Sequence, residues 1–221
     1  MDKTLMISLS YSKYSCWDKC PRKFKYRYID KLDEPKGTAM SRGTEIHESV
    51  EAYLLGKTDQ LHPDIHSYYG QFMFGLRNAG AIPEVQVAVN RDWKPVPWDA
   101  EDAYIRSVID AHLPPKDGVV QVFEWKTGKV YPEHRDQLEL YAVKIKVLYP
   151  ETKQVNVMGV YFDLKKNSVA YTHPYYYQEI KIELWDNKMR KILRDEEFIP
   201  NPSYGCKFCH FRRDNNGPCE F

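Results

Sequence analysis

Apolar and polar residues alternate along three short stretches in the middle of the chain, at 84–91, 104–113 and 119–126. Successive side chains of a β-strand point to opposite faces, so this period of two predicts three strands. One face of the third stretch would carry four side chains, those of Val120, Val122, Glu124 and Lys126. A charged pair would therefore follow two valines on the same side of a strand.

The flanking stretches predict the remaining elements. Residues 155–163 and 168–177 alternate as a closing hairpin. Helical spacing of apolar residues covers 38–56, 62–79, 134–149 and 179–197. Residues 1–31 should hold a short start and a helix, and residues 198–221 an irregular tail. The order of these elements predicts an α/β fold with a mixed sheet flanked by helices.

Composition describes an ordinary globular protein. The chain has 221 residues, of which 43% are hydrophobic and 29% charged. No apolar run is long enough to cross a bilayer, and the first residues lack the apolar core of a signal peptide, so we expect no membrane association and a cytoplasmic location. Disulfides are rare in that compartment, so the five cysteines raise the question of metal or cluster ligation.

The net charge of +1 neither indicates nor excludes nucleic acid, but the charge is unevenly distributed. Residues 13–31 hold seven lysines and arginines, including Arg22 and Lys23, against two aspartates. Aromatic residues are interleaved with these cations. Such a segment could supply backbone contacts and base stacking to DNA, which do not depend on sequence.

The candidate chemistry lies at Asp110, Glu124 and Lys126. Glu124 and Lys126 are two residues apart on one strand, which places their backbones roughly 6–7 Å apart on the same face. Two carboxylates with a lysine beside them can hold a divalent cation and position a water against a phosphodiester. The alternative interpretation is a salt-bridged strand end. His47 borders the apolar stripe of 38–56, where a histidine is more often a satisfied core residue than a ligand.

An ordered set of motifs resembles the PD-(D/E)XK nucleases of the RecB-like exonuclease branch, which includes CRISPR-associated members. The motifs are CPRKFKYRY, GTEIH with His47, VID with Asp110, EWK with Glu124 and Lys126, and QLELY with Gln137 and Tyr141. One departure is Ser107, where the family often has a glycine. The resemblance implies a restriction-endonuclease-like core.

The resemblance also implies residue roles. Asp110 and Glu124 would bind Mg²⁺ or Mn²⁺ together with the backbone carbonyl of Trp125, and His47 would be an extra ligand that favours Mn²⁺. Lys126 would orient or deprotonate the attacking water, or stabilise charge on the phosphorus. Gln137 and Tyr141 would contact DNA near the scissile phosphate, although the tyrosine could simply pack. Glu84 matches a recurrent acid of the family on the preceding strand, without a place among the metal ligands.

Four cysteines form a second candidate site. Cys206, Cys209 and Cys219 make a C-x2-C-x9-C tail, and Cys20 precedes a proline near the start. The resemblance implies a 4Fe–4S cluster that joins the two ends of the chain, although the last gap is longer than is usual in the family. Zinc, with Cys16 or His210 as a substitute ligand, and free thiols are the alternatives.

Together these features predict a metal-dependent exonuclease that acts on single-stranded or end-containing DNA in recombination, repair or replication. A structure-selective endonuclease or nickase and a catalytically silent DNA-binding subunit are the alternatives. A helicase or recombination protein is the expected partner class. We expect one nuclease domain over 1–221, comprising a segment 1–33 with Cys20, a helical region 38–80 with His47, a sheet core 84–177 with the active site, and a helix with a Cys-rich tail at 179–221.

Overall fold

The structure is a computed structural model that describes residues 7–35, 38–163, 169–176 and 181–221. The chain divides into two compact units. Unit 1 comprises Met1–Lys36 together with Glu183–Phe221, and unit 2 is the continuous stretch Gly37–Ile182. Along the sequence, unit 2 is therefore inserted between the two halves of unit 1. The single domain expected over residues 1–221 stays a prediction.

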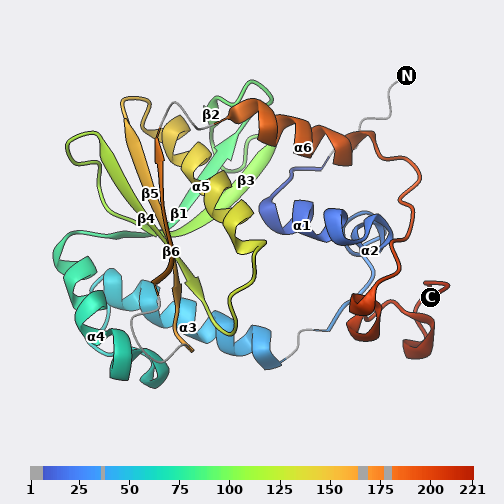
Figure 1. Ribbon diagram of the computed structural model, residues 1–221, viewed down its shortest axis with the longest axis horizontal. Coiled ribbons are helices and arrows are strands. Elements are labelled where there is room, and N and C mark those ends of the chain that lie inside the picture. The colour runs from blue at the N-terminus through green and yellow to red at the C-terminus, as the bar shows by residue number, and fades with distance from the viewer. Residues whose placement is uncertain (1–6, 36–37, 164–168, 177–180) are drawn as a thin grey trace. The chain divides into compact units, whose positions relative to one another are not determined.

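A six-stranded mixed sheet forms the centre of unit 2 (Figure 1). Its strands are β1 (Ile82–Val89), β2 (Pro95–Val96), β3 (Ile105–His112), β4 (Val119–Lys126), β5 (Gln154–Tyr161) and β6 (Val169–Tyr176). Their order across the sheet is β2-β1-β3-β4-β5-β6. The β4–β5 pair is parallel and the other neighbouring pairs are antiparallel. The predicted α/β class and mixed sheet are confirmed.

The structure adds one strand to those that the sequence predicted. β3 lies within the predicted stretch 104–113 and ends at His112, whose partner on β4 is Val122. The short strand β2, which the alternation did not predict, pairs with β1 through Val89↔Pro95. Proline fits this position because β2 is an edge strand, where a missing backbone N–H leaves no internal ladder bond unmade.

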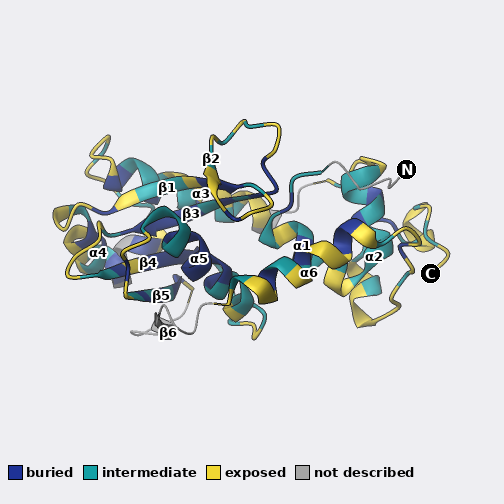
Figure 2. Cartoon of the chain, turned by 90° about the horizontal axis from the view of Figure 1, so that it is seen from above, coloured by how far each residue is buried: buried dark blue, intermediate teal, exposed yellow. Residues whose placement is uncertain are grey.

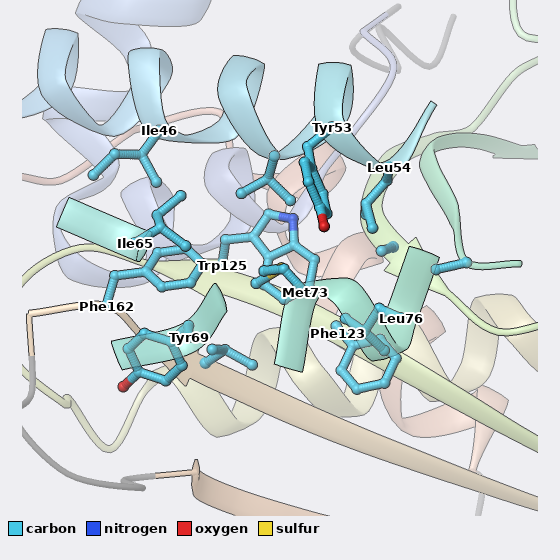
Figure 3. Packing of buried hydrophobic residues seen from close by; sticks show 14 residues of the cluster. Ile46, Tyr53, Leu54, Ile65, Tyr69, Met73, Leu76, Phe123, Trp125 and Phe162 are labelled. Atoms are coloured by element: carbon cyan, nitrogen blue, oxygen red, sulfur yellow. The ribbon is translucent and has the colours of Figure 1, made fainter. Parts of the chain in front are cut away.

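Helices cover both faces of the sheet (Figure 1). α3 (Thr38–Leu54) and α4 (Pro63–Asn78) share one hydrophobic core with the sheet, and α5 (His134–Leu148) shares another. Figure 3 shows the first core, in which the Trp125 side chain lies between α3 and α4 residues and Phe162. The buried residues of β4 and α5 are visible in Figure 2.

β4 is buried on both faces, which fixes where its charged residues lie. Phe123 and Trp125 belong to the core with α3 and α4, whereas Val120 and Val122 belong to the core with α5. By the two-residue period of a strand, the next side chain on the α5 face is that of Glu124. The hydrophobic pattern of β4 therefore directs the predicted charged pair towards α5.

Unit 1 brings the first and last parts of the chain together. Its helices are α1 (Tyr11–Lys19), α2 (Pro21–Phe24) and α6, whose span Ile182–Arg194 begins one residue before the unit. A π-helical turn η1 (Lys25–Ile29) and two 3₁₀ turns, η3 (Tyr204–Phe208) and η4 (Arg213–Asn215), complete it. The helical spacing predicted over 179–197 is confirmed for α6, whose buried residues are Trp185, Met189, Ile192 and Leu193.

Hydrogen bonds between distant residues hold the two segments of unit 1 together. The Trp17 indole Nε1 donates to Asp195 at 2.7 Å, and Arg22 Nε donates to the Phe198 carbonyl at 2.9 Å. The Tyr14 and Trp185 rings also pack edge to face, with centroids 5.5 Å apart. The sequence predicted that a cysteine-ligated cluster joins the two ends of the chain. Hydrogen bonds and ring packing between side chains also join them.

Among the helices of the described residues, not one combines the length and the apolar character that a bilayer crossing needs.

Candidate active site

β3 and β4 separate where Asp110 and Glu124 would otherwise face each other. The ladder between these two strands ends at the pair Ala111↔Phe123. Immediately beyond it, Oδ2 of Asp110 accepts the backbone N–H of Trp125 at 2.7 Å. A side-chain carboxylate thus takes the place of a backbone acceptor, and the fork in the sheet creates room for a site beside it.

The two predicted carboxylates lie in this fork and are strongly buried. Asp110 is 7% and Glu124 3% exposed. Burial and the neighbouring charge of Glu124 raise the pKa of Asp110 above its ordinary value. Burial opposes ionisation of Glu124 too, but the Lys126 ammonium, with Nζ 2.7 Å from Oε1, outweighs it and lowers the pKa of Glu124.

One oxygen of Glu124 lacks a hydrogen-bond donor. Oε1 accepts from Lys126 and from Gln137 Nε2, at 2.7 Å each. Oε2 is buried and has no hydrogen-bond partner among the residues that the structure describes. An unsatisfied buried carboxylate oxygen costs free energy, and a bound cation would remove that cost. The oxygens present in the fork therefore fit a hard divalent cation.

His47 reaches the same place from α3. Its Nδ1 lies 3.5 Å from Oδ1 of Asp110, and its Nε2 lies 3.2 Å from the carbonyl oxygen of Trp125. Burial favours the neutral ring, but Asp110 and the carboxylates of Glu124 and Glu84 outweigh it and raise the pKa of His47 to about 9. A metal ion would have to displace that proton, because only the neutral imidazole is a ligand.

Glu84 belongs to the same cluster, although sequence reasoning gave it no place among the ligands. Ligand atoms of His47, Glu84 and Asp110 all lie within 4.8 Å of one another. Glu84 also has a backbone φ of 49°, in the left-handed region that residues with a Cβ rarely adopt. The sequence showed an acid on the neighbouring strand, but strand periodicity contains no signal for its backbone conformation.

Gln137 and Tyr141 come from adjacent turns of α5. Gln137 Oε1 accepts from Lys126 Nζ at 2.8 Å, and Gln137 Nε2 also donates to the Tyr141 hydroxyl at 3.0 Å. That hydroxyl donates to the Val108 carbonyl at 2.9 Å, and Tyr141 is only 4% exposed. In this arrangement the tyrosine supports the glutamine, which in turn holds Lys126. Contact of both residues with DNA stays a prediction.

The predicted cysteine ligands line one cavity in unit 1. Its volume is about 400 Å³, and Cys20, Cys206, Cys209 and Cys219 all border it. All five cysteines of the chain are free and half-buried. Three cations, Lys19, Lys23 and Arg212, line the same cavity, and no acidic residue is among its described lining residues. Cys16 and His210, the alternative ligands for zinc, do not border it.

The two cations predicted to contact DNA both have partners within unit 1. Arg22 Nε donates to the Phe198 carbonyl at 2.9 Å, and Lys23 Nζ lies 3.2 Å from a Glu34 carboxylate oxygen. Lys23 also borders the cysteine cavity. Their placement gives them structural contacts, and their role in DNA binding stays a prediction.

A mixed sheet that forks around two buried carboxylates and a lysine, with a histidine beside them, defines the chain as a candidate hydrolase. Residues 8–213 match the sequence model of the PD-(D/E)XK nuclease superfamily, and the chain belongs to that superfamily. The nuclease class, a divalent-metal site and a DNA substrate are properties of this superfamily.

The chain is also similar to solved structures, one of which reaches a TM-score of 0.50. A candidate exonuclease from Eubacterium rectale is similar with a TM-score of 0.50 at 16% identity, over 94% of this chain and 88% of that chain. SSO0001 is similar with a TM-score of 0.49 at 18% identity, over 92% and 83% of the two chains. No curated protein sequence matches this chain. The fold is thus restriction-endonuclease-like, as predicted.

Proposed function

We propose that this chain is a Mg²⁺- or Mn²⁺-dependent deoxyribonuclease that removes nucleotides from the ends of DNA. The observation that carries the proposal is the convergence of Asp110, Glu124, Lys126 and His47 at one fork of the sheet. Asp110, Glu124, His47 and the Trp125 carbonyl are the groups that would hold the metal. When bound, a divalent cation supplies Lewis-acid chemistry that polarises a phosphoryl oxygen and makes water more acidic.

Lys126 is the residue suited to the attacking water. Its Nζ already donates to Glu124 and Gln137, which leaves one further proton for a third acceptor. A lysine held in this way orients a water or stabilises charge that develops on the phosphate. Gln137 fixes the direction of the ammonium, and α5 fixes Gln137. Hydrolysis of this kind proceeds without a covalent enzyme intermediate.

The test is cleavage of DNA labelled separately at each end, in Mg²⁺, Mn²⁺ or EDTA, with protein purified without oxygen. We expect metal-dependent release of short products that Asp110→Ala abolishes. Glu139→Gln is a matched control, because it removes a carboxylate from the same unit outside the cluster. DNA that binds wild-type protein but is never cleaved would instead support a silent DNA-binding subunit.

A covalently closed single-stranded circle separates the two enzyme alternatives. An exonuclease leaves this substrate intact and degrades its linear form, whereas a structure-selective endonuclease or nickase cuts it. Cleavage of an RNA strand of the same sequence shows whether the enzyme distinguishes ribose from deoxyribose. Partners such as a helicase, and a role in recombination or repair, stay predictions.

We also propose that Cys20, Cys206, Cys209 and Cys219 bind a 4Fe–4S cluster. The shared cavity supports this, and its cationic lining suits a ligand set of four thiolates. Zinc held by the same thiolates is the alternative.

The cofactor test is elemental analysis of anaerobically purified protein together with its visible absorption. Four iron atoms and four sulfides per chain, together with a visible absorption spectrum typical of iron–sulfur proteins, would support the cluster. One zinc ion per chain would instead support a zinc site at these cysteines. Cys16→Ala serves as the control that should keep the cofactor, because Cys16 does not border the cavity.

A further inference from the structure

Three aromatic rings form a column that leads from the core of unit 2 to its surface. They belong to Tyr161 at the end of β5, His134 at the start of α5 and Tyr131 in the loop before α5. Tyr161 is fully buried, and its ring stacks on that of His134 with centroids 5.7 Å and planes 23° apart. The His134 ring meets Tyr131 edge to face, at 5.5 Å and 79°. Tyr131 is 49% exposed, so the column ends at the surface.

The buried end of this column lies beside the charged pair of the candidate active site. In the parallel ladder of β4 and β5, Lys126 pairs with Tyr161. Glu124 pairs with Gly159 in the same ladder, and neighbouring strands are about 5 Å apart. A Cβ at Gly159 would lie only 3.1 Å from Tyr161 Cε2, so the Tyr161 ring extends over this glycine. The first ring of the column is therefore adjacent to the strand positions of Glu124 and Lys126.

Helix α5 connects the column to the active site a second time. His134 precedes Gln137 by three residues, so the two side chains share a face of the helix. Gln137 Oε1 accepts from Lys126 Nζ at 2.8 Å. The Nδ1 atom of His134 lies 2.6 Å from the Tyr161 hydroxyl. The turn of α5 that holds the lysine therefore also holds the middle ring of the column.

The loop between β4 and α5, which carries Tyr131, is fixed at both ends. At its start, the Gly128 N–H donates to the Asp163 carboxylate. At its end, the His134 N–H donates to the Tyr131 carbonyl at 3.0 Å. Pro132 disfavours a helical backbone at the residue before it, which keeps Tyr131 outside α5. The Tyr131 ring is thus held in place although half of it is exposed.

We propose that the Tyr131 ring is a stacking site for an unpaired base of the DNA strand at the active site. The inference rests on the proposed nuclease function and narrows its substrate to DNA with unpaired bases near the cut. A ring has two flat faces, and His134 can cover at most one of them. Aromatic faces stack on bases of any sequence, whereas a base inside a duplex already stacks on its neighbours. The exposed cations Lys129 and Arg135, with the single acid Glu133 between them in the sequence, suit the phosphates of such a strand.

The test is fluorescence anisotropy with a short single strand of thymidines and a strand of equal length that lacks every base, both in EDTA. We expect Tyr131→Ala to weaken binding of the thymidine strand at least about fivefold and binding of the base-free strand less than about twofold. Tyr131→Phe keeps the ring and should bind both strands within about twofold of the wild type. Phe74→Ala is the matched control, because Phe74 is another exposed aromatic residue of unit 2, on α4, and its removal should leave both affinities unchanged.

Three results would overturn the proposal. The first is wild-type affinity of Tyr131→Ala for the thymidine strand. The second is an equal loss on the two strands, which would assign Tyr131 to the shape of the loop. The third is a loss in Tyr131→Phe as large as that in Tyr131→Ala, which would assign the effect to the hydroxyl. Tyr131 is half exposed, so Tyr131→Ala should keep the melting temperature of the wild type, which separates weaker binding from unfolding.

The outcome is separable from that of the nuclease proposal, because binding is measured without cleavage. If Tyr131→Ala loses its preference for bases while wild-type protein leaves all DNA intact, the stacking site holds and the nuclease proposal fails. If wild-type protein cleaves DNA and Tyr131→Ala binds both strands normally, the nuclease proposal holds and the stacking site fails.

Discussion

At the scale of single residues, Trp125 joins the hydrophobic core to the candidate site. Its indole is 2% exposed and packs against Phe123 and Phe162, with ring centroids 6.0 and 5.9 Å away (Figure 3). Its backbone N–H binds Asp110, and its carbonyl lies beside His47. A rigid core residue therefore holds the backbone from which Glu124 and Lys126 project.

Truncation of the Trp125 side chain should strongly destabilise the protein. We expect Trp125→Ala to lower the free energy of unfolding by about 3–5 kcal/mol, because it leaves a large cavity in the core, and Trp125→Phe to lower it less. Chemical denaturation measures both values. Trp98→Ala, at a half-buried tryptophan, is the control that should cost less. A loss below about 1 kcal/mol for Trp125→Ala would contradict the role of the indole.

Lys144 is a buried lysine that has no carboxylate partner among the described residues. It is 0% exposed, its Nζ donates to the Ile105 carbonyl at 3.3 Å, and it lies 5.5 Å from the centre of the Trp93 ring. Burial lowers the pKa of Lys144 to about 7. In the unfolded chain the amine keeps its proton up to about pH 10. Between about pH 7 and 10 the unfolded chain therefore binds more protons, and stability should rise with pH.

Lys144→Met should remove this dependence. A pKa unit corresponds to about 1.4 kcal/mol, so the variant should gain on the order of 4 kcal/mol at pH 7 and below, and little near pH 10. Denaturation at several pH values measures the difference. Lys153→Met, at an exposed lysine, is the control that should show no such trend. A gain in stability that does not change with pH would contradict the effect of the buried Lys144 ammonium.

At the scale of elements, α5 acts on the site through a chain of hydrogen bonds. The Tyr141 hydroxyl connects the Val108 carbonyl of β3 to Gln137, and Gln137 holds Lys126. Because Tyr141 is almost completely buried, the helix positions the lysine from within the protein rather than from its surface.

Tyr141→Phe tests this positioning. Loss of the hydroxyl should cost about 0.5–1.5 kcal/mol of stability and lower kcat, while affinity for DNA measured without metal should remain that of the wild type. Single-turnover cleavage and fluorescence anisotropy separate the two quantities. A variant with unchanged kcat and weakened DNA binding would instead identify Tyr141 as the predicted DNA contact.

The sequence predicted most elements because their periodicity is a local property. The stretch 119–126 coincides with β4, and the predicted pairing of Glu124 with Lys126 on one face is confirmed. The sequence predicted those site residues that follow the two-residue period of a strand or belong to a motif. Glu84 was not, because its place depends on a left-handed backbone, and neither was the bond from Asp110 to Trp125, because it needs two strands that separate.

At the scale of the whole molecule, the cysteine cavity belongs to unit 1 and the carboxylate cluster to unit 2. Cys206→Ala should therefore lower the stability of unit 1 more than it alters the chemical step. Calorimetric melting and single-turnover cleavage measure these two effects, and Cys16→Ala is the control. Wild-type melting combined with lost turnover would contradict a structural role for the cluster.

The discontinuity of unit 1 also sets an order of events during synthesis on the ribosome. Trp17 and Asp195 are bonded across 178 residues, and Cys20 shares its cavity with Cys219. Unit 2 is one continuous stretch and can fold while the chain is still emerging, because the contacts within it join residues 37–182 alone. Unit 1 can complete its fold only after its second segment, Glu183–Phe221, has been synthesised. Any cofactor held by all four cysteines is therefore inserted only after translation has passed Cys219, because the cavity needs residues from both segments of unit 1.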